Sequence, residues 1–229
     1  MRTFNFLNAR NEATVHSLLE RIAAPVISVE EYRNAFQSIG YELGSLLRED
    51  LSSIPEAQIM FAFASEDSDW LGRGVLSGTH KEHARISVFW NGRNVVYENK
   101  VEKIEVSPII KSYEEEVDGC RYLVIIKSII NTSCVVQTQL TRMISKFEPE
   151  KIFVIAPVMY KDAERSLAEE FPRNISRKFS YLYFALDDER EGSVVKPGVG
   201  GMVYSRLGLG DVNSKNSYMP EIVKERMGF

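Results

Sequence analysis

Cysteine and histidine are scarce in this sequence. Two cysteines and three histidines occur among 229 residues, and Cys120 and Cys134 form no Cys-x-x-Cys pair. Structural zinc sites need several such residues at close spacing, so the sequence predicts no metal site. Chains this poor in cysteine are typical of reducing compartments, and we expect a cytoplasmic protein whose core forms without disulfides.

An excess of positive charge is also missing. The sequence holds 28 Lys and Arg against 32 Asp and Glu, a net charge of −4. Because neutralising phosphates supplies most of the affinity for nucleic acids, this balance disfavours a nucleic-acid partner. No apolar run reaches the roughly 18–20 residues of a membrane-spanning helix, and residues 1–10 lack the pattern of a signal peptide. We therefore expect no membrane partner.

The first quarter of the chain has helical periodicity. Residues 13–23 carry apolar side chains at helical spacing, and residues 28–51 continue the pattern over a longer stretch. Ser28 and Glu31 form a capping-box pattern, in which each side chain can bond the other residue's backbone amide. We predict an N-terminal helical pair within residues 1–55.

The rest of the chain alternates apolar runs with helical patterns. Residues 58–64, 121–126, 151–156 and 179–186 read as strands, and 129–147 and 161–171 read as helices. Strands buried on both faces that alternate with helices are typical of a parallel sheet. We predict an α/β fold, with a mostly parallel central sheet flanked by helices, in one domain spanning residues 1–229.

A β-hairpin is expected to project from this domain. Residues 84–90 and 94–99 flank Asn91-Gly92, the strongest two-residue hairpin signal in the chain. We predict a hairpin excursion over residues 84–110. Its edge, with Trp90, would offer apolar surface for self-association, and a symmetric homodimer is the expected assembly.

Residues 123–135 read Leu-Val-Ile-Ile-Lys-Ser-Ile-Ile-Asn-Thr-Ser-Cys-Val. This segment resembles the phosphoribosyl-pyrophosphate motif of type I phosphoribosyltransferases. In that motif an apolar strand precedes two acids, two or three apolar residues and a Thr-Gly-x-Thr-like loop that opens a helix. Backbone amides and hydroxyl groups of such a loop hold the sugar's 5′-phosphate. The resemblance implies these phosphate-binding candidates: Lys127, Asn131, Thr132, Ser133, Cys134 and Val135.

The segment departs from the motif at its acids. Lys127 and Ser128 stand where the two acids would bond the ribose hydroxyls, Ser133 replaces a glycine, and Val135 replaces a hydroxyl residue. Lys127 fits a phosphate contact or a solvated charge equally well. The turn that begins at Asn131 fits a helix N-cap as well as an anion site. Cys134 is expected to be a packed residue rather than a nucleophile.

The C-terminal third resembles uracil phosphoribosyltransferases more specifically. Residues 194–201 read Val-Val-Lys-Pro-Gly-Val-Gly-Gly, similar to that family's uracil-binding Tyr-Ile-x-Pro-Gly-x-Gly-Asp stretch. The glycine-rich segment 192–216 would then be the base-side loop, although a tight surface turn explains its glycines equally well. The resemblance implies these base-binding candidates: Val195, Pro197, Gly198 and Gly200.

Three functions follow from the resemblance. The first is a phosphoribosyltransferase-like protein with impaired catalysis that binds a nucleotide, nucleobase or sugar phosphate in a regulatory or protein-partner-binding role. The second is an active uracil-type enzyme that uses magnesium and recruits acids from elsewhere, such as Asp67, Asp69 or Asp187. The third is an RNA-binding regulator on the same fold. Whether the chain is an enzyme stays open at this stage, and no catalytic residue is assigned.

Overall fold

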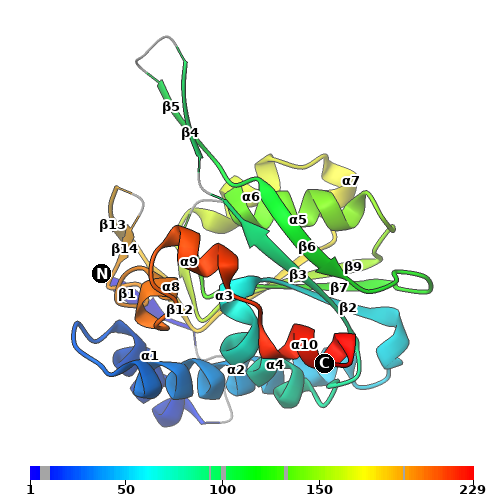
Figure 1. The fold of residues 1–229 in the computed structure, drawn as a ribbon, viewed down its shortest axis with the longest axis horizontal. Helices are drawn as coiled ribbons and strands as arrows, with labels where there is room; N and C mark the ends of the chain where they lie inside the picture. The colour runs from blue at the N-terminus through cyan, green and yellow to red at the C-terminus, as the bar shows by residue number, and fades with distance from the viewer. Residues whose placement is uncertain (6–10, 93, 99–101, 132–133, 193) are drawn as a thin grey trace.

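The computed structural model describes residues 1–5, 11–92, 94–98, 102–131, 134–192 and 194–229. Within these ranges, helices lie on both sides of a central sheet, and a two-stranded arm projects from it (Figure 1). None of the helices in the described ranges combines the length and apolar character that crossing a membrane requires. The predicted α/β fold with a mostly parallel sheet is confirmed.

The central sheet has six strands in the order β11-β9-β7-β2-β3-β6. All neighbours are parallel except β6, which runs antiparallel to β3. The inner strands are continuous apolar runs because helices cover both faces of the sheet. The bounds are β2 (Ile59–Ala64), β3 (Arg85–Asn91), β6 (Ile109–Glu114), β7 (Tyr122–Ile126), β9 (Lys151–Ile155) and β11 (Phe179–Leu182).

A second sheet continues three of these strands. Two residues separate β7 from β8 (Ile129–Ile130), β9 from β10 (Val158–Tyr160), and β11 from β12 (Ala185–Asp187). The fourth strand of this sheet, β1 (Arg2–Phe4), pairs antiparallel with β12. The three two-residue joints lie level, because β9 is in register with β7 and β11, and β10 is in register with β8 and β12.

The prediction of one strand over residues 179–186 is therefore wrong. The ladder is interrupted at 183–184, where the carbonyl of Pro157 accepts hydrogen bonds from the amides of both Phe184 and Ala185. Proline has no amide with which to continue a ladder, so the chain changes sheets beside it. The predicted helix 129–147 is likewise shorter, because residues 129–130 form β8 and α5 covers Cys134–Ile144.

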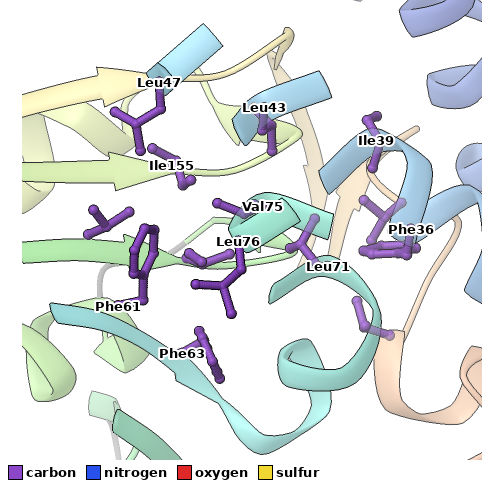
Figure 2. Close-up of a cluster of buried hydrophobic side chains, with 14 of the residues drawn as sticks. Phe36, Ile39, Leu43, Leu47, Phe61, Phe63, Leu71, Val75, Leu76 and Ile155 are labelled. Carbon is purple, nitrogen blue, oxygen red and sulfur yellow. The ribbon is translucent and has the colours of Figure 1, made fainter. Parts of the chain in front are cut away.

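Helices bury the two faces of the central sheet separately. The predicted N-terminal pair is confirmed as α1 (Glu12–Ala23) and α2 (Val29–Leu51), with the capping box of Ser28 and Glu31 in place. Together with α4 (Arg73–Thr79) this pair packs on the face that presents Phe61 and Phe63 (Figure 2). The other face is covered by α5 and α6 (Ala163–Glu169), which is shorter than the predicted 161–171 and is followed by α7 (Arg173–Ser176).

Four glycines bring α2 unusually close to α4 and the turn before it. Gly40 and Gly44 of α2 face Gly74 and Gly78 of α4 at matching four-residue spacing. A Cβ atom added to any of the four would lie 2.2–2.4 Å from a carbonyl oxygen of the facing backbone. This packing fixes the segment that joins β2 to α4, namely α3 (Ser65–Asp67) and a π-helical turn, η2 (Ser68–Gly72).

The predicted hairpin turn at Asn91-Gly92 is wrong. β3 belongs to the central sheet, and the projecting arm instead pairs β4 (Asn94–Glu98) with β5 (Glu102–Val106) (Figure 1). Asn91 lies where the β3–β6 register shifts; its side-chain amide donates to the Ser107 carbonyl, and the Gly92 amide donates to the Pro108 carbonyl. These residues join the arm to the sheet instead of reversing the chain.

Trp90 is buried in the core, with its indole Nε1 donating to the Tyr218 carbonyl at 2.7 Å. The prediction that Trp90 contributes apolar edge surface is therefore wrong.

The C-terminal region returns over the ends of the strands. A small hairpin of β13 (Glu189–Glu191) and β14 (Val194–Lys196) leads into the glycine-rich segment, which contains α8 (Val203–Arg206) and α9 (Val212–Ser217). The N-terminus of the last helix, α10 (Glu221–Met227), lies against Asp69 of the π-helical turn. The Asp69 carboxylate accepts hydrogen bonds from the backbone amides of Glu221 and Ile222 at 2.7 and 2.9 Å, and from the Tyr218 hydroxyl.

Candidate functional site

The parallel part of the sheet has a point where the strand order reverses. From β2 the chain continues to β3 on one side, and later from β7 to β9 and β11 on the other. In open α/β sheets, ligands bind beyond the carboxyl ends of the strands at such a point. The residues that follow β2 and β7 are therefore the natural candidates for a site, and they include Glu66, Asp67, Lys127 and Ser128.

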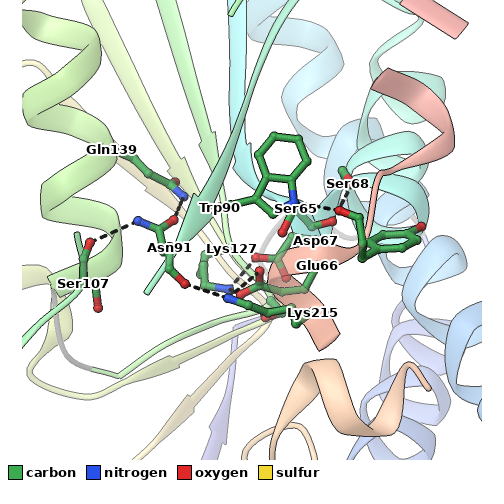
Figure 3. Close-up of polar contacts among 12 residues, drawn as sticks. Ser65, Glu66, Asp67, Ser68, Trp90, Asn91, Ser107, Lys127, Gln139 and Lys215 are labelled. Atoms are coloured by element: carbon green, nitrogen blue, oxygen red, sulfur yellow. Dashed lines mark hydrogen bonds and ion pairs between the residues drawn. The ribbon is translucent and has the colours of Figure 1, made fainter. Parts of the chain in front are cut away.

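Lys127 lies at this point and is bound to the loop after β2. Its Nζ is 2.5 Å from Oδ2 of Asp67 and 3.4 Å from Oε1 of Glu66 (Figure 3). The lysine is 8% exposed and Asp67 is 1% exposed, so the alternative of a solvated charge at the strand end is wrong. Lys127 is thus held by two acids from the segment that follows the neighbouring strand β2.

A second lysine reaches the same place from the C-terminal region. Nζ of Lys215, on α9, lies 3.5 Å from Oε2 of Glu66 and donates to the Asn91 carbonyl at 2.9 Å. Glu66, Asp67, Lys127 and Lys215 are all buried, and we refer to them as the buried quartet. Two carboxylates and two ammonium groups make it neutral in sum.

Attraction between opposite charges favours the charged forms of two members of the quartet, Lys127 and Glu66. Burial alone would lower the pKa of Lys127, but Asp67 and Glu66 raise it above its ordinary value. Burial would raise the pKa of Glu66, and the ammonium groups of Lys127 and Lys215 outweigh this and lower it. Opposite charges at close range favour the charged form of each partner. Burial raises the pKa of Asp67, and the attraction of Lys127 offsets this only in part.

Among the other phosphate-binding candidates, those that the structure describes lie between β8 and the first turn of α5. Asn131 follows β8, and Cys134 and Val135 form the first residues of the helix, all three half-buried. Thr132 and Ser133 lie outside the described residues. The N-terminus of an eleven-residue helix carries a partial positive charge. Whether these residues bind phosphate stays a prediction.

Main-chain groups of two base-binding candidates, Gly198 and Gly200, form hydrogen bonds within the protein. Pro197 follows a cis peptide bond, and Val195 is buried in β14. The Gly198 amide donates to Asp187, while the Gly198 carbonyl accepts from Arg2 at 2.6 Å. The Gly200 carbonyl accepts from an arginine of α8 at 2.7 Å. A base that reads these main-chain groups would have to share or displace such partners.

The acids that could have been recruited for catalysis already have structural partners. Asp67 holds Lys127, and Asp69 caps α10. Asp187 is fully buried and forms a bidentate ion pair with Arg2 at 2.7 and 2.8 Å. The described residues contain no group of three or more His, Cys, Asp or Glu side chains arranged to hold a metal ion.

Sequence reasoning missed three residues of this region. Lys215 stands in the polar run Asn-Ser-Lys-Asn-Ser, which carries no motif, and Arg2 stands alone near the N-terminus. Glu66 is assigned no role from the sequence. A signal for Glu66 did exist, because an acid after β2 and a base after β7 are adjacent in any parallel sheet that reverses order between these strands.

No protein-family model matches the sequence, and no curated protein matches it. Among solved structures, the AQ2163 protein from Aquifex aeolicus is similar at a TM-score of 0.66 and 16% identity, over 85% of this chain and 94% of that chain.

Two further structures are similar at lower scores. A hypothetical protein from Neisseria gonorrhoeae with bound ppGpp has a TM-score of 0.42 and 8% identity, over 63% of this chain and 80% of that chain. The hypoxanthine-guanine phosphoribosyltransferase of L. donovani has a TM-score of 0.39 and 10% identity, over 65% and 76%. Scores this low carry no argument about function. The chain therefore shares its fold with AQ2163, and phosphoribosyltransferases are among the weaker structural similarities.

Proposed function

We propose that this chain is a phosphoribosyltransferase-like protein in which ordinary transfer from phosphoribosyl pyrophosphate is impaired. It binds a nucleotide, nucleobase or sugar phosphate and serves a regulatory or partner-binding role. The observation that carries the proposal is the ion pair of Lys127 with Asp67 at the point where the strand order reverses. A lysine there cannot accept hydrogen bonds from ribose hydroxyls, as the two acids of the motif would.

The size of the effect on catalysis follows from hydrogen-bond energies. A hydrogen bond to a charged group contributes about 1.5–3 kcal/mol, and each ~1.36 kcal/mol of lost transition-state stabilisation slows a reaction about tenfold. Loss of two carboxylates that act on one sugar is therefore expected to reduce turnover by several orders of magnitude. Lys127 also adds positive charge where a magnesium ion would need acids.

A second candidate function has one observation in its favour. Glu66 and Asp67 place two carboxylates on the neighbouring strand end, next to the position of the missing pair. An active uracil-type phosphoribosyltransferase could use them together with magnesium.

An assay with purified protein, uracil, labelled phosphoribosyl pyrophosphate and magnesium separates the two functions. The proposed function predicts no turnover above background. It also predicts a rise in melting temperature with at least one member of a panel of nucleotides, nucleobases and phosphorylated sugars, since a ligand that binds the native state stabilises it. Magnesium-dependent formation of UMP that is lost in the variant N131A/T132A would instead establish the enzyme.

Several properties remain predictions beside this proposal. They are the homodimer, the cytoplasmic location, a protein partner, the single domain over residues 1–229 and the preference for a uracil-like base. Because Trp90 is buried, a dimer that uses the arm would have to rely on other residues. Light scattering of the purified chain tests the dimer.

A further inference from the structure

A polar groove lies over the face of α2 that points away from the core. Five residues of α2 between Asn34 and Glu42 line it, together with Thr14 of α1 and Gly74 and Ser77 of α4. Its volume is about 480 Å³, within the roughly 300–1,000 Å³ of small-molecule sites. Figure 1 shows these three helices together on one side of the sheet. None of the lining residues belongs to the candidate site described above.

The close contact of α2 with α4 leaves one wall of this groove bare. Gly74 lies so near α2 that a Cβ atom on it would be 2.2 Å from the Gln37 carbonyl oxygen. Because glycine has no side chain, α4 presents only backbone and the Ser77 side chain to the groove. The space beside α2 is therefore a consequence of the glycine packing.

Glu42 is the only charged residue among the described residues that line the groove. Its side chain is half-buried, and it forms no hydrogen bond or ion pair within the part of the chain that the structure describes. Burial raises the pKa of the Glu42 carboxyl, and no nearby cation counters this. A half-buried carboxylate without a counterion costs free energy that a cationic ligand would recover.

The other side chains of the groove are neutral and able to form hydrogen bonds. Asn34, Gln37, Ser38 and Tyr41 are exposed, and none of their side chains bonds another described residue. They offer amide and hydroxyl groups to a ligand's polar atoms. The Tyr41 ring can in addition attract a cation that lies over its face.

These features restrict the class of ligand. An anion would meet an uncompensated carboxylate, and a neutral ligand would cover Glu42 without supplying its counterion. A divalent metal ion needs several oxygen ligands, whereas the groove holds one carboxylate. A protein interface needs an apolar core, and the Tyr41 ring is the only large apolar surface among the lining residues.

We propose that the groove over α2 binds a small organic cation, namely a primary amine or guanidinium compound that carries further polar groups and no acid. Glu42 pairs with the cation, and the amide and hydroxyl side chains of α2 bond the rest of the ligand. This site is separate from the one at the strand ends, so the inference goes beyond the proposed function and does not depend on it.

The test follows the backbone amide signals of the full, isotope-labelled chain by NMR during titration with matched probes. The pairs are protonated glucosamine with glucose, and N-acetylargininamide with N-acetylcitrullinamide. In each pair the first compound carries one positive charge and the second is neutral and similar in size. We expect at least one charged probe to bind about tenfold or more tightly than its neutral partner, with shifts centred on residues 34–42 and 74–77.

The variant E42Q tests the role of the carboxylate. Glutamine keeps the shape and removes the charge, so E42Q should lose the preference for the charged probe. E30Q makes the same change at an exposed glutamate in the first turn of α2, outside the groove, and should keep that preference. Without ligand, E42Q should melt at the same temperature as wild type or higher, because it removes a partly buried charge that has no partner.

Equal binding within both pairs, or no binding of either charged probe, would overturn the inference. It also fails if E42Q keeps the full preference, or if the shifts lie away from the groove. A lower melting temperature of E42Q without ligand would show that Glu42 already stabilises the fold through a partner, which contradicts the premise. The assay for turnover of phosphoribosyl pyrophosphate tests the proposed function separately, so failure of one is distinguishable from failure of the other.

Discussion

Gly44 of α2 lies so close to Val75 of α4 that a methyl group on Gly44 would be 2.3 Å from the Val75 carbonyl oxygen. The reverse contact occurs at Gly78, where a methyl group would be 2.2 Å from the Tyr41 carbonyl oxygen. Each helix thus packs on the bare backbone of the other. The segment that carries Glu66 and Asp67 continues through η2 into α4, so the contact between α2 and α4 helps to position both acids.

Alanine at Gly44 or Gly78 is expected to destabilise the protein by about 1–3 kcal/mol or more through overpacking. Alanine is otherwise better than glycine inside a helix by about 0.5–1 kcal/mol, so a loss of stability has to come from the helix contact. Urea unfolding measures the change. S38A, on the exposed side of α2, is the control and should be neutral. Stabilisation by G44A would show that the helices lie further apart.

Replacement of Lys127 by methionine is expected to cost about 3–5 kcal/mol, because it leaves Asp67 buried without its cation. K224M is the control, since Lys224 is an exposed lysine of α10 paired with Glu221. Its effect should stay within about 0.5 kcal/mol. The double variant K127M/D67N should recover part of the loss. Equal stability of K127M and K224M would mean that the ion pair does not form in solution.

The low pKa of Glu66 makes stability depend on pH in one direction. A carboxyl group whose pKa is lower in the folded state stabilises the protein above its unfolded pKa, near the ordinary value of 4.5, and this contribution is lost as the pH falls through the folded value. Wild type should therefore lose stability below about pH 4.5 more steeply than E66Q. Melting curves from pH 3 to 7 measure the difference. Parallel curves would contradict the assignment.

Asp69 is expected to hold α10 in place. D69A removes the acceptor of two backbone amides and the Tyr218 hydroxyl, so the segment 218–229 should exchange its amides faster while the central sheet stays protected. Loss of a helix cap costs about 0.5–2 kcal/mol. E225A is the control for this measurement, because Glu225 is an exposed residue of α10 whose ion pair with Arg73 lies at the surface. Unchanged exchange in 218–229 would show that α10 is held by its apolar contacts alone.

Local signals explain what the sequence predicted correctly. The capping box at Ser28 and the apolar spacing of α2 act within a few residues, and the buried strands carry unbroken apolar runs. The second sheet could not be predicted in this way, because strands of two or three residues such as β8 have no periodicity to detect. The hairpin turn predicted at Asn91-Gly92 was wrong because these two residues, although typical of tight turns, form the junction between the central sheet and the arm.

The phosphate and base sites stay predictions, and the partners of Lys127 could not be predicted from the sequence. The sequence draws attention to Lys127 because this residue departs from the motif that its segment resembles. Its partners Asp67 and Glu66 lie 60 and 61 positions away in the chain, and such distant pairing leaves no local pattern. Residues 65–69 are all polar or charged in the sequence, yet Ser65 to Asp69 are all buried. The free-energy cost of a charged side chain depends on whether that side chain is buried, which the sequence alone does not show.

The level joints between the two sheets constrain how this chain can change in length. Side chains alternate between the two faces of a strand, so one residue gained or lost in a joint would turn the strand beyond it inside out. Such a change in length would also shift β8, β10 or β12 out of register with the strands beside it. Insertions and deletions in descendants of this sequence should therefore avoid 127–128, 156–157 and 183–184 and accumulate in segments such as the arm.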